Sequence, residues 1–217
     1  MPAYTTEPRY NILCFGDSNT FGTNPSGGRW SRYTRWPGRL QQLLGEAYYV
    51  IEEGFSGRTT VFDDPLVPGR NGRTALPYAL TCHRPLDLVI LMLGSNDMKH
   101  LFSALPASIA RGAGELVKAI KRYDYGPFAA PQVLLVSPIL LGEDIEHSAY
   151  VDYGPEAYGY SLQLAAHYEK VARAHGCHFM DAAKITCPSQ IDQLHMDASE
   201  HEKLAQAFAA RVREILP

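Results

Sequence analysis

The stretch Asp87-Leu88-Val89-Ile90-Leu91-Met92-Leu93 decides the fold class, because every residue after the aspartate is apolar. A strand with one face in water alternates polar and apolar residues, whereas a strand that is covered on both faces is apolar throughout. A second run of this kind occupies residues 132–137. Parallel sheets carry helices on both faces, so the two runs predict a parallel sheet in an α/β protein.

Further elements lie on both sides of these two strands. Three shorter apolar runs predict strands, at residues 11–15, 48–51 and 177–181. Helical patterns occupy residues 36–44, 74–82, 108–123, 157–175 and 199–216. Strands and helices therefore alternate, which predicts a three-layer α/β domain with a five-stranded parallel sheet. No linker divides the chain, and we expect residues 1–217 to form one domain.

Charge and hydropathy exclude several classes of partner. The chain has 20 Lys and Arg against 23 Asp and Glu, and neither sign forms a long block. We therefore expect no nucleic-acid partner. No run reaches the roughly 18 apolar residues that span a bilayer, so we expect no membrane partner. Residues 1–10 contain no apolar signal segment, which favours a cytoplasmic location.

The four cysteines predict neither a disulfide scaffold nor a metal site. Cys14, Cys82, Cys177 and Cys187 form no CxxC pair, and the histidines lack ligand spacing. We expect all four thiols to be reduced, with Cys14 and Cys177 in the core. We also expect no metal and no cofactor.

Polar residues follow the strands where each of them ends. They are Gly16-Asp17-Ser18-Asn19 after the first strand, Gly57-Arg58 after the second, and Gly94-Ser95-Asn96-Asp97 after the third. Asp192 and His195 precede the last helix. Ligands bind at the carboxyl ends of parallel strands, so this edge would receive a nucleophile, hydrogen-bond donors and an Asp/His pair. Those are the parts of an acyl-transfer site.

Each part taken alone also has a structural interpretation. Ser18 is in the right place to cap a helix, and Gly57 suits a turn. For Asp97 we favour a loop role, in which the carboxylate accepts from backbone amides. Asp192 and His195 could form a solvated approach to the helix. We expect no catalytic role for His100 or His201. The joint occurrence of all the parts at successive strand ends favours catalysis.

These residues resemble the four signature blocks of the SGNH or GDSL hydrolase superfamily, which contains esterases and lipases. The matching blocks are Gly16-Asp17-Ser18, Gly57, Gly94-Ser95-Asn96-Asp97 and Asp192 to His195. The resemblance implies a flavodoxin-like α/β/α sandwich. Residues 52–60, with Asp63-Asp64 and Arg70-Asn71-Gly72, resemble the bacterial arylesterase and acyltransferase (perhydrolase) subgroup.

The resemblance implies a role for each matching residue. Ser18 would be the nucleophile, His195 its base and Asp192 the residue that orients the imidazole. The backbone N–H groups of Ser18 and Gly57 and the side chain of Asn96 would form the oxyanion hole. These roles agree with the chemistry, because a serine hydroxyl needs a nearby base and a developing oxyanion needs fixed donors.

One position departs from the pattern. Asn19 stands where many members of the superfamily have leucine. We expect Asn19 to influence substrate preference more than mechanism. The resemblance also implies a homo-oligomer. The long loops at residues 58–73 and 138–155 are candidates for pocket walls or subunit contacts.

The expected activity is hydrolysis or transfer of short-chain or aryl acyl groups through an acyl-enzyme on Ser18. A carbohydrate deacetylase with the same triad is an alternative within this class. The alternative from another class is a flavodoxin-like module that binds the phosphate of a flavin or nucleotide in the loop after the first strand. That module does not explain Asp192 and His195, and Asp17 would repel a phosphate.

Overall fold

Strand β3 (Leu88–Met92) lies in the middle of a five-stranded sheet, as its apolar sequence predicts. The computed structural model describes residues 9–217. All neighbouring strands are parallel, and their order is β2-β1-β3-β4-β5. The other strands are β1 (Tyr10–Gly16), β2 (Tyr48–Gly54), β4 (Gln132–Ser137) and β5 (His178–Asp181).

The register of the strands brings their carboxyl ends to one edge. Gly16 at the end of β1 pairs with Gly54 of β2 on one side and with Met92 of β3 on the other. The segments that leave these three strands therefore begin side by side. This is the edge at which the sequence predicts the catalytic groups.

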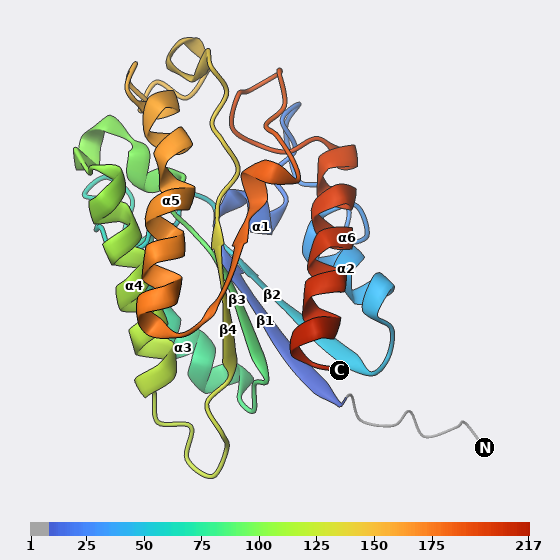
Figure 1. Ribbon diagram of the computed structural model, residues 1–217. Coiled ribbons are helices and arrows are strands. Elements are labelled where there is room, and N and C mark those ends of the chain that lie inside the picture. The colour runs from blue at the N-terminus through green and yellow to red at the C-terminus, as the bar shows by residue number, and fades with distance from the viewer. Residues whose placement is uncertain (1–8) are drawn as a thin grey trace.

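Helices cover both faces of the sheet (Figure 1). Helices α2 and α6 lie on one face, and α3, α4 and α5 lie on the other. Within residues 9–217 the helices are α1 (Ser18–Phe21), α2 (Trp36–Leu44), α3 (Gly72–His83), α4 (Pro106–Arg122), α5 (Ala157–His175) and α6 (Ala198–Ile215). The 3₁₀ turns are η1 (Asn96–Met98), η2 (His100–Phe102), η3 (Ile145–His147) and η4 (Ala182–Lys184).

Alternate residues of the central strands enter two separate cores. Leu13 of β1 and Val89 of β3 pack under α3, α4 and α5, whereas Ile12 and Leu88 pack under α2 and α6. Successive side chains of a strand point to opposite faces of a sheet. The apolar run of β3 is thus explained by burial on both faces, which confirms the predicted three-layer α/β/α architecture.

The predicted elements are all present, and their observed ends differ from the predicted ends by a few residues. Helix α4 begins at Pro106 rather than at residue 108, since proline is tolerated in the first helical turn. The expectation for the cysteines is only partly correct. Cys14 is buried in the core, but Cys177 lies just ahead of β5 and is only partly buried.

Two further expectations concern the membrane and the first residues. Across residues 9–217, none of the helices has the length and hydropathy needed to cross a bilayer. The first eight residues, on which the expectation about secretion mainly rests, lie outside the described residues.

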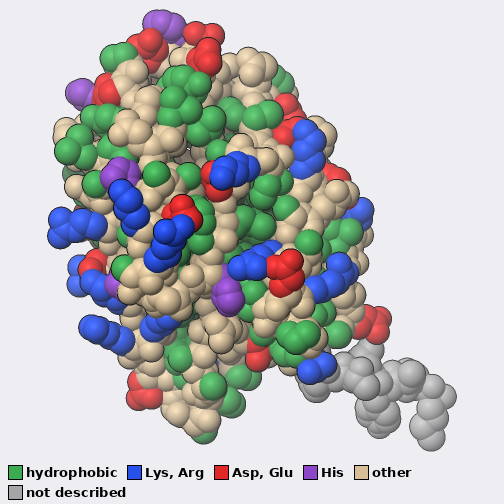
Figure 2. Space-filling view, viewed as in Figure 1, with side chains coloured by type: hydrophobic (Ala, Val, Ile, Leu, Met, Phe, Trp, Pro, Cys, Tyr) green, Lys and Arg blue, Asp and Glu red, His purple; other side chains and the backbone are tan. Residues whose placement is uncertain are grey.

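Basic side chains gather on one face of the molecule, over α4 and α5 on the left of Figure 2. Some of them pair with an acidic residue of their own helix. Lys118 lies 2.7 Å from Glu115 on α4, and Arg173 lies 2.5 Å from Glu169 on α5. These pairs follow the three- and four-residue spacing of a helical surface.

Candidate active site

Ser18 is the first residue of α1, a helix of four residues that directly follows β1. The residue that caps this helix is Asp17, whose carboxylate accepts a hydrogen bond of 3.0 Å from the backbone N–H of Asn19. The capping interpretation of Ser18 is therefore wrong, because Asp17 already fills that role. Burial raises the pKa of Asp17 to about 6.

The side chains of Asp192 and His195 extend from Ser18 as a hydrogen-bonded chain. Nε2 of His195 lies 2.9 Å from Oγ of Ser18, and Nδ1 lies 2.7 Å from Oδ2 of Asp192. All three residues are buried, with exposed fractions of 6%, 6% and 3% for Ser18, Asp192 and His195. The interpretation of Asp192 and His195 as a solvated approach to α6 is therefore wrong.

Backbone amides hold the other oxygen of Asp192. Oδ1 accepts from the N–H groups of Leu194, at 3.0 Å, and His195, at 2.9 Å. Burial raises the pKa of Asp192, but the hydrogen bonds from His195 and Leu194 outweigh it, and the net pKa lies below the ordinary value. The carboxylate that faces Nδ1 is therefore ionised at neutral pH.

Ser18, Gly57 and Asn96, the residues of the predicted oxyanion hole, line the same cavity. The Nδ2 atom of Asn96 donates to the backbone oxygen of Arg58 at 3.1 Å, which fixes the amide and leaves its second N–H free to point elsewhere. The backbone N–H groups of Ser18 and Gly57 have no acceptor among residues 9–217. The predicted oxyanion-hole residues are therefore brought together.

Gly57 needs both its backbone conformation and its missing side chain. Its φ of +81° lies in the left-handed region, which residues with a β-carbon rarely adopt. A β-carbon at this position would also collide with the guanidinium of Arg70. That guanidinium is held by Asp64, whose Oδ2 lies 2.6 Å from Nη1 of Arg70.

Asp97 has the loop role that the sequence favours. Its carboxylate is buried and accepts hydrogen bonds from the backbone N–H and the hydroxyl of Thr60. Burial raises the pKa of Asp97 to about 7. Asp97 thus ties the segment after β3, which carries Asn96, to the segment after β2, which carries Gly57.

These groups line a cavity of about 180 Å³. Most of its lining residues have polar side chains, and they are Ser18, Thr23, Ser56, Gly57, Arg70, Asn96, Lys99, Tyr150, Leu194 and His195. Arg70 and Tyr150 belong to the two long loops, so both loops are pocket walls. Asn19 is not among the lining residues, and the sequence-based expectation that it acts on substrate preference is not supported by its position.

Sequence reasoning missed the roles of Tyr150 and Lys99. The hydroxyl of Tyr150 lies 3.3 Å from Nδ1 of His195, and the two rings meet edge to face. Nζ of Lys99 lies 3.2 Å from Asp152, in the same loop as Tyr150. The length of that loop was a signal for function, but no pattern within it distinguishes Tyr150 from its neighbours.

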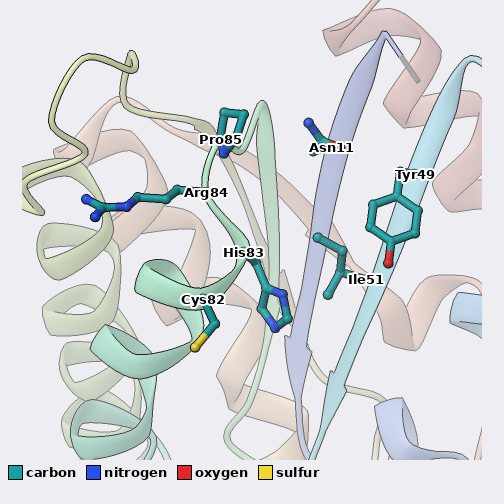
Figure 3. A pocket seen from close by; sticks show the side chains of 7 residues that line it. All are labelled: Asn11, Tyr49, Ile51, Cys82, His83, Arg84 and Pro85. Carbon is teal, nitrogen blue, oxygen red and sulfur yellow. The ribbon is translucent and has the colours of Figure 1, made fainter. Parts of the chain in front are cut away.

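A larger cavity of about 640 Å³ lies at the opposite, amino-terminal end of the sheet (Figure 3). Asn11 of β1, Ile51 of β2 and His83 of α3 contribute to its lining. Nε2 of His83 lies within hydrogen-bond distance, 2.8 Å, of Oε1 of Glu53. No serine lines this cavity, so its volume alone does not make it the better candidate for acyl transfer.

His100 and His201, for which the sequence predicts no catalytic role, do not line the pocket. The side chain of His100 is 77% exposed, and His201 is buried between α6 and α2. Within residues 9–217, no group of three His, Cys, Asp or Glu side chains has the arrangement of a metal site.

Comparisons with known proteins place the chain in a family. The sequence profile of the GDSL-like lipase/acylhydrolase family matches residues 14–206. A search of curated proteins by sequence gave no significant match.

Solved structures give the same result. The chain is similar to the native aryl esterase of M. smegmatis, with 37% identity and a TM-score of 0.88 over 95% of this chain and 100% of that chain. It is also similar to a carbohydrate acetylesterase from Sinorhizobium meliloti, with 36% identity and a TM-score of 0.89 over the same shares. A lipase/acylhydrolase from Enterococcus faecalis, at 17% identity and a TM-score of 0.67 over 94% of this chain and 96% of that chain, shares the fold.

The family's activity is ester hydrolysis rather than flavin or nucleotide binding, so the alternative of a phosphate-binding module is wrong. The chain belongs to the GDSL-like lipase/acylhydrolase family and is a carboxylic ester hydrolase.

Proposed function

We propose that the protein is a serine esterase that acts on short-chain or aryl carboxylic esters through an acyl-enzyme on Ser18. The observation that carries the proposal is the unbroken chain from Ser18 through His195 to Asp192, with contacts of 2.9 and 2.7 Å. A nucleophile, its base and the group that orients the base are thereby joined in the order that acyl transfer needs.

In the proposed first step, Oγ of Ser18 attacks the carbonyl carbon of the ester, and its proton passes to Nε2 of His195. Asp192 stabilises the imidazolium that forms. The carbonyl oxygen becomes an oxyanion, which accepts hydrogen bonds from the N–H groups of Ser18 and Gly57 and from Asn96. The proton on His195 then goes to the leaving alcohol as the carbon–oxygen bond breaks.

The second step releases the acyl group. A water molecule attacks the acyl carbon of the acyl-enzyme, and His195 takes its proton. The bond between the acyl carbon and Oγ of Ser18 then breaks, and His195 returns the proton to Oγ. A second alcohol in place of water would give acyl transfer. The cavity volume of about 180 Å³ favours a short acyl group over a fatty-acyl chain.

A carbohydrate acetylester is the second candidate substrate. The lining of the cavity favours it, because Leu194 is the only aliphatic side chain among residues with hydroxyl, amide, guanidinium and ammonium groups. Such groups can bind sugar hydroxyls. Initial rates on an acetylated sugar and on p-nitrophenyl acetate, compared as kcat/KM, separate the two substrate classes.

The proposed nucleophile is tested by covalent labelling with a fluorophosphonate, followed by peptide mapping. We expect the label on Ser18, and we expect Ser18→Ala to lose both the label and the esterase activity, because the hydroxyl is the group that forms the bond. The matched control is Ser56→Ala, since Ser56 lines the same cavity without a bond to His195. Labelling of Ser56, or a Ser18→Ala variant that keeps more than about a hundredth of the turnover, would remove Ser18 from the mechanism.

We also propose that the chain forms a homo-oligomer through its two long loops. Exposed apolar side chains on these loops support the proposal: Leu66 is 77% exposed and Val151 is 87% exposed.

A further inference from the structure

The side-chain amide of Asn19 makes hydrogen bonds on both sides of His195. Nδ2 donates to the backbone oxygen of Leu194 at 3.1 Å, and Oδ1 accepts from the backbone N–H of Met196 at 3.2 Å. Asn19 is only 2% exposed and does not line the cavity, so its amide faces the backbone around His195 rather than a substrate.

These two bonds connect the two segments that carry the reacting atoms. Asn19 follows Ser18 directly within α1, whereas His195 lies 177 residues after Ser18, on the segment between η4 and α6. The carbonyl oxygen of His195 itself accepts a hydrogen bond from the backbone N–H of Ser189 at 2.7 Å. Nε1 of Trp30 also donates to the backbone oxygen of Met196, at 3.1 Å, but Asn19 is the one of the two that belongs to the helix of Ser18.

A leucine cannot make either bond. The superfamily pattern has leucine here in many members, and that side chain would leave the oxygen of Leu194 and the N–H of Met196 without their partner. Unpaired backbone groups in a buried place are costly, so the segment would shift to pair them. A shift of the histidine segment moves Nε2 away from Oγ of Ser18.

We propose that Asn19 is a positioning residue, which sets the distance between Nε2 of His195 and Oγ of Ser18 by bonding the backbone on both sides of His195. This inference rests on the proposed function, because it needs Ser18 and His195 to react. It assigns Asn19 to the geometry of catalysis rather than to the choice of substrate. A misplacement of about 1 Å at reacting atoms can reduce a rate by about 100-fold.

The chain contains a matched control for this arrangement. Gln41 makes the same pair of bonds around Tyr49: Nε2 donates to the oxygen of Tyr48 at 2.8 Å, and Oε1 accepts from the N–H of Val50 at 2.8 Å. These bonds lie at the beginning of β2, at the end of the sheet opposite to Ser18. Nε2 of Gln41 also donates to the backbone oxygen of Gly45 at 3.2 Å, so Gln41→Leu removes this pair of bonds and one more without touching the active site.

The experiment compares Asn19→Leu and Gln41→Leu by steady-state kinetics with p-nitrophenyl acetate, by the rate of fluorophosphonate labelling and by thermal melting. We expect Asn19→Leu to lower kcat and the labelling rate by about 10- to 100-fold, with KM within about 3-fold of the wild type. We expect Gln41→Leu to lower the melting temperature but to leave kcat within about 2-fold, because its bonds are only structural.

A second variant covers the case in which leucine prevents folding. Asn19→Ser adds no bulk and replaces the two amide atoms by one hydroxyl on a shorter side chain, which weakens the pair of bonds, so we expect a smaller loss of kcat in the same direction. A kcat for Asn19→Leu or Asn19→Ser within about 2-fold of the wild type would overturn the inference, as would an equal loss of kcat in Gln41→Leu. Ser18→Ala in the same assay separates the two hypotheses, because an active Ser18→Ala variant contradicts the proposed function itself.

Discussion

The side-chain amide of Asn96 has two N–H bonds, and the fold uses one of them. That bond goes to the backbone oxygen of Arg58 at 3.1 Å and holds the amide in place before any substrate binds. A donor that is fixed in advance stabilises an oxyanion without reorganisation. We therefore expect Asn96→Ala to lower kcat by roughly 10²- to 10³-fold, about 2.7 to 4 kcal/mol, with much less change in KM.

Kinetics and thermal melting on the same preparation of Asn96→Ala test this expectation. If the amide only supported the loop by its bond to Arg58, its removal would lower stability by about 1 kcal/mol and leave kcat near the wild-type value. A lowered melting temperature with an unchanged kcat would therefore leave the oxyanion hole with its two backbone donors alone.

The proposed catalytic residues could be picked out from the sequence because they lie close together in the chain or follow strands that end at one edge of the sheet. Asp192 and His195 are three residues apart, and Ser18, Gly57 and Asn96 follow strands whose ends share one edge. Tyr150 lies 45 residues from His195 in an irregular loop, so its contact depends on tertiary packing that no local pattern encodes. The contacts of Asn19 are even more distant, at 175 and 177 residues, so the sequence shows only its departure from the superfamily pattern, which is interpreted there as a matter of specificity.

At the scale of the elements, α6 and α2 meet through a buried histidine. His201 of α6 accepts a hydrogen bond of 3.2 Å on Nδ1 from the backbone N–H of Trp36, in the first turn of α2. Burial, with smaller contributions from the neighbouring His195 and Arg35, lowers the pKa of His201 from 6.5 to about 3. The folded chain therefore keeps this ring neutral at pH values at which the unfolded chain protonates it.

The sign of the pH effect follows from this difference. Between pH 6.5 and about 3, the unfolded state binds a proton on His201 that the folded state does not, so stability falls as pH falls. The slope for one proton is about 1.4 kcal/mol per pH unit. Asp17 and Asp97 act in the opposite direction, because burial raises their pKa values to about 6 and about 7.

We expect His201→Gln to reduce the acid sensitivity of the fold, because the glutamine oxygen can accept from Trp36 but does not titrate. Urea denaturation at about pH 7 and about pH 5 measures the effect, since the two aspartates are common to both proteins and cancel in the comparison. The wild type should lose more stability than His201→Gln between these two pH values. Equal losses would mean that His201 is accessible to protons in the folded state.

The strands and long helices could be predicted because each has a periodic or continuous apolar pattern. The exception is α1, whose four residues are too few to show a period. It forms because Asp17 caps its first turn and Gly22, with φ of +87°, closes its end. The element that presents Ser18 is therefore built by a cap and a glycine rather than by an apolar face.

At the scale of the whole molecule, the two long loops surround the pocket and carry apolar side chains into solvent. Arg70 and Tyr150 of these loops line the cavity, while Leu66 and Val151 are 77% and 87% exposed. Assembly of subunits through the loops would remove this apolar surface from water and would narrow the entrance. We expect light scattering to give a mass above that of one 24.1 kDa chain.

The contact surface can be tested with the double variant Leu66→Asp with Val151→Asp, which we expect to shift the mass towards that of a single chain, because a buried charge opposes association. Leu162→Asp is the control, since Leu162 is 54% exposed on α5 outside both loops. The wild type should also prefer p-nitrophenyl acetate to the palmitate ester, because the narrow entrance excludes a long chain. A wild type that is monomeric at every concentration, or that prefers the palmitate ester, would show that the loops do not form subunit contacts that restrict the pocket.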